Sequence, residues 1–282
     1  MNKKIMLLKI LFIFVFLLNT SFSYAKNDKL YNLDKNQIND LIYSIKNKSL
    51  DEKIKIISEK ELTTNYKLDP LGEGSESKYD KEPIYDLKNV DCVTFTEQTL
   101  ALALSSNFED FINVLQKIRY KNGEIKMEKR NHYFIADWMI NNNWLVEDFN
   151  KKITEKADYN EKLISHQKIL GKYALKDLEP DRMVKVNYIP KTELNSIEDK
   201  LLSGDILVFI QKKNDIDASH VGIIIKEKGK TYFRNATSLA PKMVVDSEFS
   251  KTVDYIKNSQ KHLGISILRL KNEKAIYDYL KK

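Results

Sequence analysis

Cysteine is nearly absent from this sequence, because Cys92 is the only one among 282 residues. A disulfide bond within the chain is therefore excluded. A single cysteine is often a small buried apolar residue, and the alternative is a reactive thiol. The compartment and the residues around Cys92 have to decide between these two interpretations.

Several other features are missing. No stretch after residue 18 is long and apolar enough to cross a membrane. No basic block contains interleaved aromatic residues, so we do not expect nucleic-acid binding. No histidines, aspartates and glutamates are grouped at metal-ligand spacing, so we expect neither a metal nor another cofactor. The formal net charge is +7, of which three lysines among the first 25 residues contribute three, leaving +4 for the remainder.

The first 25 residues predict a secretory signal peptide. Residues 5–18 are apolar except for Lys9, and Ser23-Tyr24-Ala25 ends the segment with small residues where signal peptidase reads. We expect cleavage after Ala25 and export to the periplasm or the extracellular space, without stable membrane insertion afterwards. An uncleaved anchor is the alternative, but the apolar run is shorter than the roughly 20 residues that a spanning helix needs.

Export bears on the lone cysteine. No cysteine follows the apolar run, which excludes a lipid-modified N-terminal cysteine. In an oxidising compartment a thiol without a purpose is a liability. The predicted signal peptide therefore favours a reactive Cys92 over an inert one.

Beyond the signal peptide we expect two parts. Residues 26–66 are predicted to form an N-terminal helical extension, with one helix over residues 33–46 and another after the capping-box pattern Ser49-Leu50-Asp51-Glu52. Residues 67–282 are predicted to form the main domain. Residues 63–88 contain proline, glycine and serine without periodicity, which predicts a long ordered loop that leads to Cys92.

Cys92 stands at the start of a predicted helix over residues 91–105, with Asp91 suited to the N-cap position. A thiol in the first turn lies at the positive end of the helix dipole, near unpaired N–H groups. That setting lowers the pKa of a cysteine and favours a thiolate nucleophile. Another helix is predicted to begin at about Asn107.

Residues 130–140 mix charged residues, a histidine and large aromatic residues, and they allow two interpretations. The first is an amphipathic helix whose buried residues are Phe134, Trp138 and Ile140. The second is a cleft whose rim carries Arg130, His132 and Tyr133. The sequence leaves both open.

The second half of the chain changes character. Residues 150–173 are charged and give no clear pattern, and we expect His166 at the surface. Strands are then predicted at residues 184–188, 206–210, 219–225, 231–235 and 265–270. Helices that precede consecutive antiparallel strands predict an α+β fold rather than a parallel sheet.

Three separated residues could form one catalytic site: Cys92 at a helix start, His220 at a strand start and Asn235 on the next strand. A thiol nucleophile needs a base, and the base needs a polar group that orients it. If the two strands pair, the imidazole and the carboxamide lie side by side on one face of the sheet. A helix packed on that face would bring Cys92 to them. His220 taken alone is more often a structural histidine.

These residues resemble a known family, the N-acetylmuramoyl-L-alanine amidase-like group of bacterial exported proteins, within the NlpC-type, papain-like cell-wall cysteine peptidases. The resemblance spans about residues 70–270. The matching segments, in the family's order, are Asp91-Cys92-Val93-Thr94-Phe95-Thr96-Glu97, Arg130-Asn131-His132-Tyr133-Phe134 with Asp137-Trp138, Tyr188-Ile189-Pro190-Lys191, Ser203-Gly204-Asp205-Ile206 and Ser219-His220-Val221-Gly222-Ile223. Each segment is weak alone, and together they are specific.

The resemblance implies a papain-like fold for residues 67–282, with the nucleophile helix packed on an antiparallel β-sheet. It implies Cys92 as the nucleophile and His220 as the general base. Relatives in the wider superfamily bind the peptide end of the substrate with residues that match Asp91 and Ser219. Where the family usually carries a histidine, this chain has Asn235, which can orient an imidazole through its carbonyl oxygen.

The resemblance thus predicts a secreted cysteine hydrolase that cuts an amide bond in peptidoglycan or muropeptides. The bond is either muramoyl–L-alanine, as the family name favours, or one inside the stem peptide, as a clamp of Asp91 and Ser219 would favour. We expect substrate contacts also from Arg130, His132 and Tyr133. The alternatives are a non-catalytic cell-wall-binding protein with the same fold, and a structural exported protein with an inert cysteine.

Overall fold

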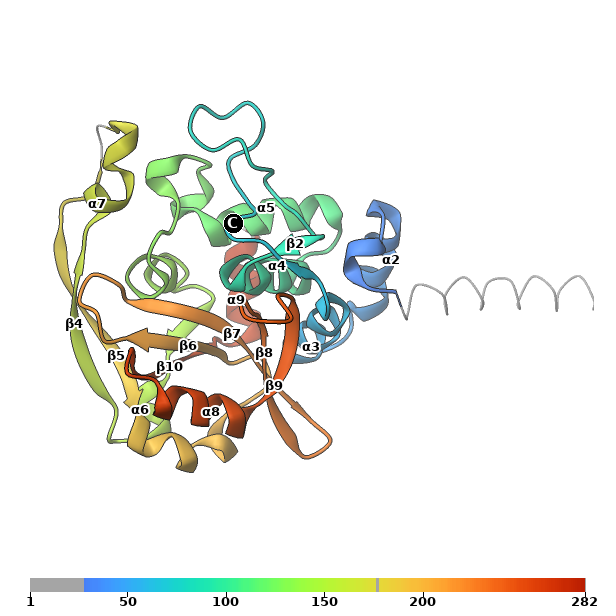
Figure 1. Ribbon diagram of the computed structural model, residues 1–282. Helices are drawn as coiled ribbons and strands as arrows, with labels where there is room; N and C mark the ends of the chain where they lie inside the picture. Colours follow the sequence, from blue (N-terminus) through green and yellow to red (C-terminus); the bar gives the residue numbers. More distant parts are fainter. Residues whose placement is uncertain (1–27, 176–177, 282) are drawn as a thin grey trace, which may run out of the picture.

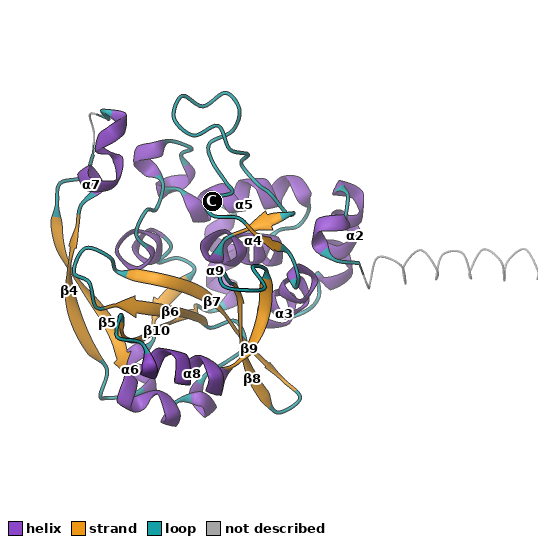
Figure 2. Ribbon diagram, viewed as in Figure 1, coloured by secondary structure: helices purple, strands orange, loops and turns teal. Residues whose placement is uncertain are grey.

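The computed structural model describes residues 28–175 and 178–281. The predicted signal peptide, residues 1–25, lies outside these residues. The structure is a mixed α+β fold in which an antiparallel sheet carries helices on both faces (Figures 1 and 2). Within the described part, none of the helices has the length and apolar character that crossing a bilayer would require.

Most of the helices precede the central strands of the sheet. The longer ones are α2 (Lys35–Ile45), α3 (Leu50–Glu61), α4 (Cys92–Leu104), α5 (Phe108–Arg119), α8 (Phe249–Asn258) and α9 (Glu273–Leu280), and the short ones are α6 (Asn150–Ile153) and α7 (His166–Leu170). The prediction of two N-terminal helices followed by two helices around Cys92 is confirmed. The predicted capping box is present at Ser49, before α3, and Asp91, which was predicted as an N-cap, caps α4 and forms a capping box there as well.

The strands form one large sheet in the order β4-β5-β10-β6-β7-β8-β9, with β3 also paired to β10, and a separate parallel pair of β1 and β2. Their bounds are β1 (Asn65–Tyr66), β2 (Asn89–Val90), β3 (Val146–Asp148), β4 (Asp158–Ile164), β5 (Arg182–Pro190), β6 (Ile206–Gln211), β7 (Ala218–Glu227), β8 (Lys230–Ala236), β9 (Val244–Glu248) and β10 (His262–Leu270). The five predicted strands appear as β5, β6, β7, β8 and β10. The sequence missed β4, because this edge strand is largely polar, and also β9.

The large sheet separates two hydrophobic cores. Along β7, Val221, Ile223 and Ile225 face the core that contains α4, whereas Ile224 faces the core that contains α8. This alternation follows from the two-residue period of a strand. Buried residues of α2 and α3 belong to the same core as those of α4. The predicted N-terminal extension therefore packs directly behind the helix that begins with Cys92.

The loop over residues 63–88 is ordered, as predicted, and the helical half of the molecule holds it in place. The Arg119 guanidinium donates to the carbonyl oxygens of Leu71 and Gly72, and the Tyr120 hydroxyl donates to Gly72. Arg130 forms an ion pair with Asp80 at 2.9 Å. These contacts fix the chain that runs into Cys92.

Candidate active site

Cys92 is the first residue of α4, and Asp91 caps the helix. Asp91 Oδ1 accepts hydrogen bonds from the Thr94 N–H and the Thr94 hydroxyl, both at 2.8 Å, and Oδ2 accepts from the Asp69 N–H at 3.2 Å. The Asp91 N–H donates in turn to Thr94 Oγ1 at 2.9 Å. This network holds the thiol and the first N–H groups of α4 in a fixed position.

A β-bulge brings His220 to the site. Phe209 of β6 lies opposite His220, but the next residue of β6, Ile210, lies opposite Ala218, so Ser219 is the extra residue. Bulges re-aim side chains and often occur beside active sites. The His220 ring makes edge-to-face contacts with the rings of Phe209 and Phe233, whose centroids lie 5.2 and 5.7 Å from its own.

His220 is held by Asn235. His220 Nε2 lies 2.8 Å from Asn235 Oδ1, and Asn235 Nδ2 donates to the Phe233 carbonyl oxygen at 3.2 Å. Because the second bond fixes the orientation of the carboxamide, Oδ1 is the acceptor and His220 Nε2 carries the proton. The lone pair of the imidazole is therefore at Nδ1, where a base needs it.

Gly222 allows this pair to form. The β7–β8 ladder runs from Ile223–Arg234 to Glu227–Lys230, and Gly222 is the residue of β7 that lies just beyond the end of this ladder. A Cβ atom on Gly222 would lie 2.5 Å from the Arg234 carbonyl oxygen and 2.8 Å from Asn235 Cβ. Glycine is thus required for Asn235 to approach His220.

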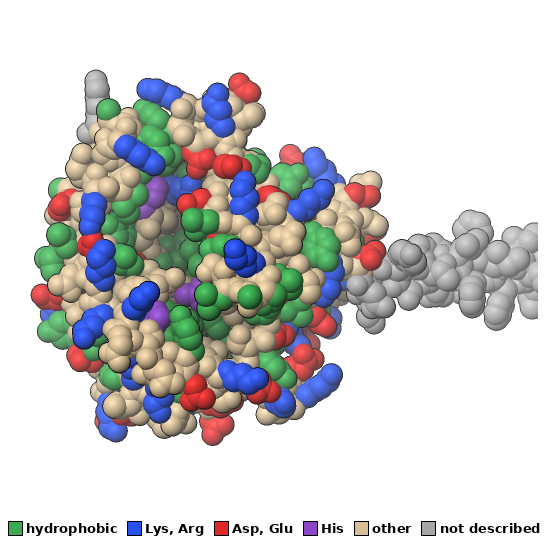
Figure 3. All heavy atoms as spheres, in the orientation of Figure 1, with side chains coloured by type: hydrophobic (Ala, Val, Ile, Leu, Met, Phe, Trp, Pro, Cys, Tyr) green, Lys and Arg blue, Asp and Glu red, His purple; other side chains and the backbone are tan. Residues whose placement is uncertain are grey.

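Cys92 and His220 line a common cleft of about 140 Å³. The other lining residues are Val93, Asn131, His132, Phe134, Asp217, Ala218, Ser219 and Val221. Histidine side chains lie along a hollow on the face shown in Figure 3. Helix α4 packs on one face of the sheet. The side chains of His220 and Asn235 lie on the other face, where the His220 ring contacts Phe209 and Phe233. The prediction that helix and histidine share one face is therefore wrong, and Cys92 and His220 instead line the same cleft just beyond the end of the β7–β8 ladder.

The expected substrate-binding residues are arranged in different ways. Ser219 and His132 line the cleft. Arg130 pairs with Asp80, and the Tyr133 side chain is buried, with its hydroxyl donating to the Ser165 carbonyl oxygen. Arg130 and Tyr133 are therefore not among the lining residues, in contrast to the rim position expected for them.

The thiol is not activated in the way that the helix start predicts. Burial raises the pKa of Cys92 to about 12, and the nearby Asp91 carboxylate adds to this, although backbone N–H groups of Val221, Cys92 and Val93 act in the opposite direction. Burial also lowers the pKa of His220, against the effect of its bond to Asn235. Before substrate binds, the site therefore holds a neutral thiol and a neutral imidazole at neutral pH.

Residues 130–140 do not form the expected regular amphipathic helix, and not all of the residues that were expected to be buried are buried. Residues Phe134–Met139 form a π-helical segment, in which Phe134 and Trp138 are buried but Ile140 is 47% exposed. Asp217, next to the start of β7, accepts the N–H groups of Ile135 and Ala136 at 2.7 and 2.9 Å. This buried carboxylate joins the π-helical segment to the strand of His220.

The prediction that His166 lies at the surface is wrong. Its side chain is buried, and Nε2 lies 2.8 Å from Asp137 Oδ2. Asp137 also bonds Arg182 at 2.9 Å. This network could not be predicted from the sequence, because its members come from three distant segments.

Tyr66, a residue that the sequence did not single out, lies close enough to Cys92 for the two groups to interact electrostatically, but it is not among the residues that line the cleft. Burial raises the pKa of its hydroxyl to about 12, and the charges of Cys92, Asp91 and Asp69 add to the effect. Tyr66 is thus a protonated hydrogen-bond donor near the thiol. Its position depends on pairing between β1 and β2, which a two-residue strand does not reveal in the sequence.

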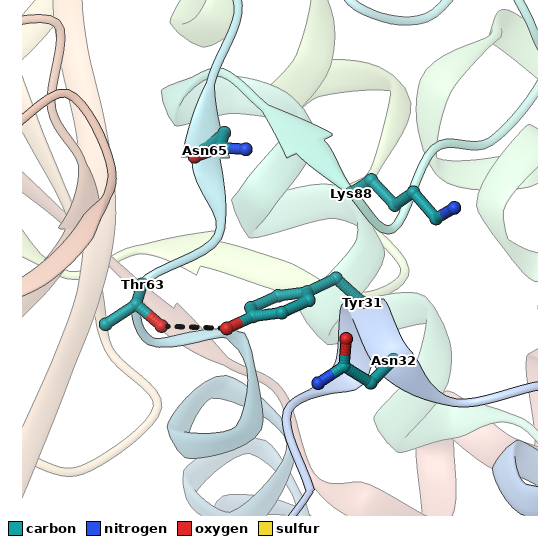
Figure 4. A pocket seen from close by; sticks show the side chains of 5 residues that line it. All are labelled: Tyr31, Asn32, Thr63, Asn65 and Lys88. Atoms are coloured by element: carbon teal, nitrogen blue, oxygen red, sulfur yellow. Dashed lines mark hydrogen bonds between the residues drawn. The ribbon is translucent and has the colours of Figure 1, made fainter.

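A larger hollow of about 500 Å³ lies elsewhere, lined by Tyr31, Asn32, Thr63, Asn65 and Lys88 (Figure 4). The hydroxyls of Tyr31 and Thr63 are 3.3 Å apart. None of the candidate catalytic residues lines this hollow. Among the residues that the structure describes, no group of three or more histidines, cysteines, aspartates or glutamates could hold a metal ion.

Comparisons with known proteins agree with the geometry. A family model described as N-acetylmuramoyl-L-alanine amidase-like matches residues 56–265. A Legionella pneumophila protein is 27% identical, with a TM-score of 0.77, over 84% of this chain and 94% of that one. An N-acetylmuramoyl-L-alanine amidase from Bacteroides uniformis is 25% identical, with a TM-score of 0.64, over 79% of this chain and 99% of that one. A search of curated proteins finds no match.

Proposed function

We propose that this chain, which belongs to the N-acetylmuramoyl-L-alanine amidase-like family, is an exported cysteine hydrolase that cleaves an amide bond of peptidoglycan. One observation carries the proposal: Cys92 and an imidazole oriented by Asn235 line the same cleft. The packing of the cysteine helix on an antiparallel sheet supports a papain-like, NlpC-type fold.

In the proposed reaction, the Cys92 thiol gives its proton to His220 Nδ1 as sulfur attacks the amide carbon. The bond from His220 Nε2 to Asn235 stabilises the imidazolium that forms. The N–H groups at the start of α4 stabilise the oxyanion. His220 then protonates the leaving nitrogen, the C–N bond breaks, and a thioester remains on Cys92.

Water completes the cycle. His220 takes a proton from the water as it attacks the thioester, and the C–S bond breaks to release a carboxylic acid and the free thiol. No step requires a metal ion or another cofactor. A neutral thiol and a neutral imidazole before substrate binds are consistent with these reaction steps, because the thiol loses its proton during the attack rather than before it.

We infer that the scissile bond joins the muramoyl lactyl group to L-alanine. The family description and the name of the Bacteroides uniformis protein favour this bond. The Asp91 carboxylate already accepts three hydrogen bonds from Thr94 and Asp69. It is therefore poorly suited to clamp the ammonium group of a free stem peptide, as a stem-peptide endopeptidase would require.

The proposal is tested by digesting purified muropeptides and analysing the products by mass spectrometry. Release of the intact stem peptide is expected, and Cys92→Ala and His220→Ala should each abolish it. A cut that leaves L-alanyl-D-glutamate on the muramoyl group and releases the rest of the stem would instead identify an endopeptidase. The alternative of a non-catalytic wall-binding protein is correct if the folded protein cleaves no muropeptide and the Cys92→Ala variant binds the cell wall as tightly as the unmodified protein.

A further inference from the structure

Arg234 is a buried cation that the proposed reaction does not use, and it stands next to Asn235 in β8. Its side chain is only 3% exposed. Successive residues of a strand point to opposite faces of a sheet. The Asn235 side chain therefore lies with His220 on one face, whereas the Arg234 side chain lies against α3 on the other. A buried charge is costly unless it is paired and hydrogen-bonded, so the partners of this guanidinium indicate what it holds in place.

The Arg234 guanidinium binds two elements at once. Its Nε and Nη2 atoms donate to the two carboxylate oxygens of Asp246, the cross-strand neighbour on β9, both at 2.7 Å. Its Nη1 atom donates to Ser58 Oγ at 2.9 Å and to the Lys55 carbonyl oxygen at 3.3 Å, both on α3. Because the donors of a guanidinium have a rigid fork geometry, these bonds fix the end of β8 relative to α3 and β9.

This end of β8 is not paired with the strand of His220. The β7–β8 ladder ends at Arg234, whereas the pairing of β8 with β9 continues through Asn235 and Ala236. The distance from Asn235 to His220 is therefore not set by a ladder between their own two strands. It depends instead on where β9 and α3 hold β8.

The same face of α3 also contacts the nucleophile helix. Glu61, three residues after Ser58, accepts a hydrogen bond from the Thr99 hydroxyl of α4, the helix that begins with Cys92. Residues three apart on a helix are neighbours on its surface. One helix of the N-terminal extension thus supports both the strand of Asn235 and the helix of Cys92.

We propose that Arg234 is a positioning residue for the catalytic pair: its bonds to α3 and β9 hold Asn235 within hydrogen-bonding distance of His220, and they make the N-terminal extension part of the catalytic framework. Arg234 is not among the residues that line the cleft, so it acts through Asn235. The inference rests on the proposed function for the role of the pair, but not for the contact that Arg234 maintains.

The first test separates kcat from KM. Arg234→Lys keeps the charge, but one ammonium group cannot bond both Asp246 oxygens and two α3 atoms in the same geometry. We expect kcat to fall about tenfold with KM unchanged, because a catalytic group is displaced while the cleft stays intact. Arg269→Lys is the matched control, since Arg269 makes the same bidentate pair with Asp205, at 2.8 and 2.7 Å, and does not line the cleft. Its kcat should be that of the unmodified protein.

The second test observes the contact without any substrate. The chain has four histidines, so in protein labelled with ¹⁵N-histidine the Nε2 proton of His220 is assigned by its loss in His220→Ala. Its exchange with water should be about tenfold faster in Arg234→Lys and in Asn235→Ala, the effect of one lost hydrogen bond. Arg269→Lys should leave it unchanged. The double variant of Arg234 and Asn235 should exchange no faster than Asn235→Ala alone.

An unchanged exchange rate in folded Arg234→Lys would overturn the inference, and so would equal losses of kcat in Arg234→Lys and Arg269→Lys. If Arg234→Lys does not fold, Ser58→Ala decides the matter: it removes one bond to α3 and should accelerate the exchange about threefold. Failure of the proposed function looks different. A protein that cleaves no muropeptide, yet shows the faster exchange in Arg234→Lys, would contradict the hydrolase and leave the hold of Arg234 on Asn235 intact.

Discussion

At the residue scale, the main feature of the site is that the Cys92 thiol keeps its proton while His220 is neutral. Desolvation and the Asp91 charge hold Cys92 as a thiol, and burial keeps His220 neutral. Many cysteine enzymes instead keep a thiolate–imidazolium pair at rest. A neutral pair protects a lone thiol from oxidation until substrate occupies the cleft, since the thiolate is the reactive form.

Alkylation of the only cysteine reports this protonation state. The rate of reaction with iodoacetamide should rise about tenfold per pH unit between pH 7 and 10, because the thiolate fraction grows in this way below a pKa of about 12. Mass spectrometry at each pH measures the rate, with free cysteine, whose curve has its midpoint near pH 8.5, as the control. A rate that is already constant from pH 6 upward would reveal an ion pair instead.

Residue-level inference from the sequence selected two residues that share a cleft, but it was wrong about the direction of the thiol pKa shift. Cys92 and His220 were found from their places at element starts and from motif order, and both line the cleft. The thiol pKa was predicted in the wrong direction, because the helix dipole is a local property whereas desolvation depends on the segments that cover the thiol. His166 failed for the same reason, since its partner Asp137 lies on another segment.

At the element scale, the site lies where β7 and β8 stop pairing. Their ladder ends at Ile223–Arg234, and the bond between His220 and Asn235 spans the gap beyond it. The hairpin itself was predictable from the alternating pattern of the two strands. The position of the His220–Asn235 pair beyond the ladder was not, because it depends on the bulge at Ser219 and on the close approach at Gly222.

Gly222→Ala should separate the imidazole from its orienting amide. The added methyl group would force Asn235 away, and a displacement of about 1 Å at a catalytic group can cost on the order of 100-fold in kcat. Turnover and thermal unfolding are measured together. Ile224→Val, on the same strand, should cost about 1 kcal/mol of stability and leave kcat unchanged. Full activity in a folded Gly222→Ala protein would contradict this role for Gly222.

At the scale of the whole molecule, buried carboxyl groups join the helices to one another. Glu61 of α3 accepts a hydrogen bond from Thr99 of α4, and Glu97 contacts Arg119 at 3.3 Å and accepts from Trp138 at 3.1 Å. Burial raises the pKa of Glu61 to about 8 and that of Glu97 to about 7. Both are protonated in the folded protein under conditions that ionise them in the unfolded chain.

These shifts predict that the free energy of unfolding falls as pH rises above about 6.5. The unfolded glutamates ionise near 4.5, so between that value and about 8 the folded state binds more protons and loses stability with rising pH. Below about 6.5, His132 and His262 act in the opposite direction, because their pKa values are lowered to about 4. The net loss is therefore expected between pH 6.5 and 8.

Glu61→Gln isolates one of these groups, since glutamine can still accept the bond from Thr99. Urea unfolding at pH 6.5 and 8 should show a smaller loss of stability than in the unmodified protein, by up to about 2 kcal/mol. Glu59→Gln, an exposed change on the same helix, is the matched control. An identical pH dependence in Glu61→Gln and the unmodified protein would mean that Glu61 is ionised in the fold.

The order of strands in the sheet also governs when the site can exist. β10, the last strand described, lies at the centre of the sheet between β5 and β6. Until it inserts, β5 and β6 present unpaired edges to each other. Contacts so distant in sequence form slowly. A nascent or truncated chain without β10 therefore has two half-sheets, so the sheet that supports Cys92 and His220 is completed only after β10 has been made.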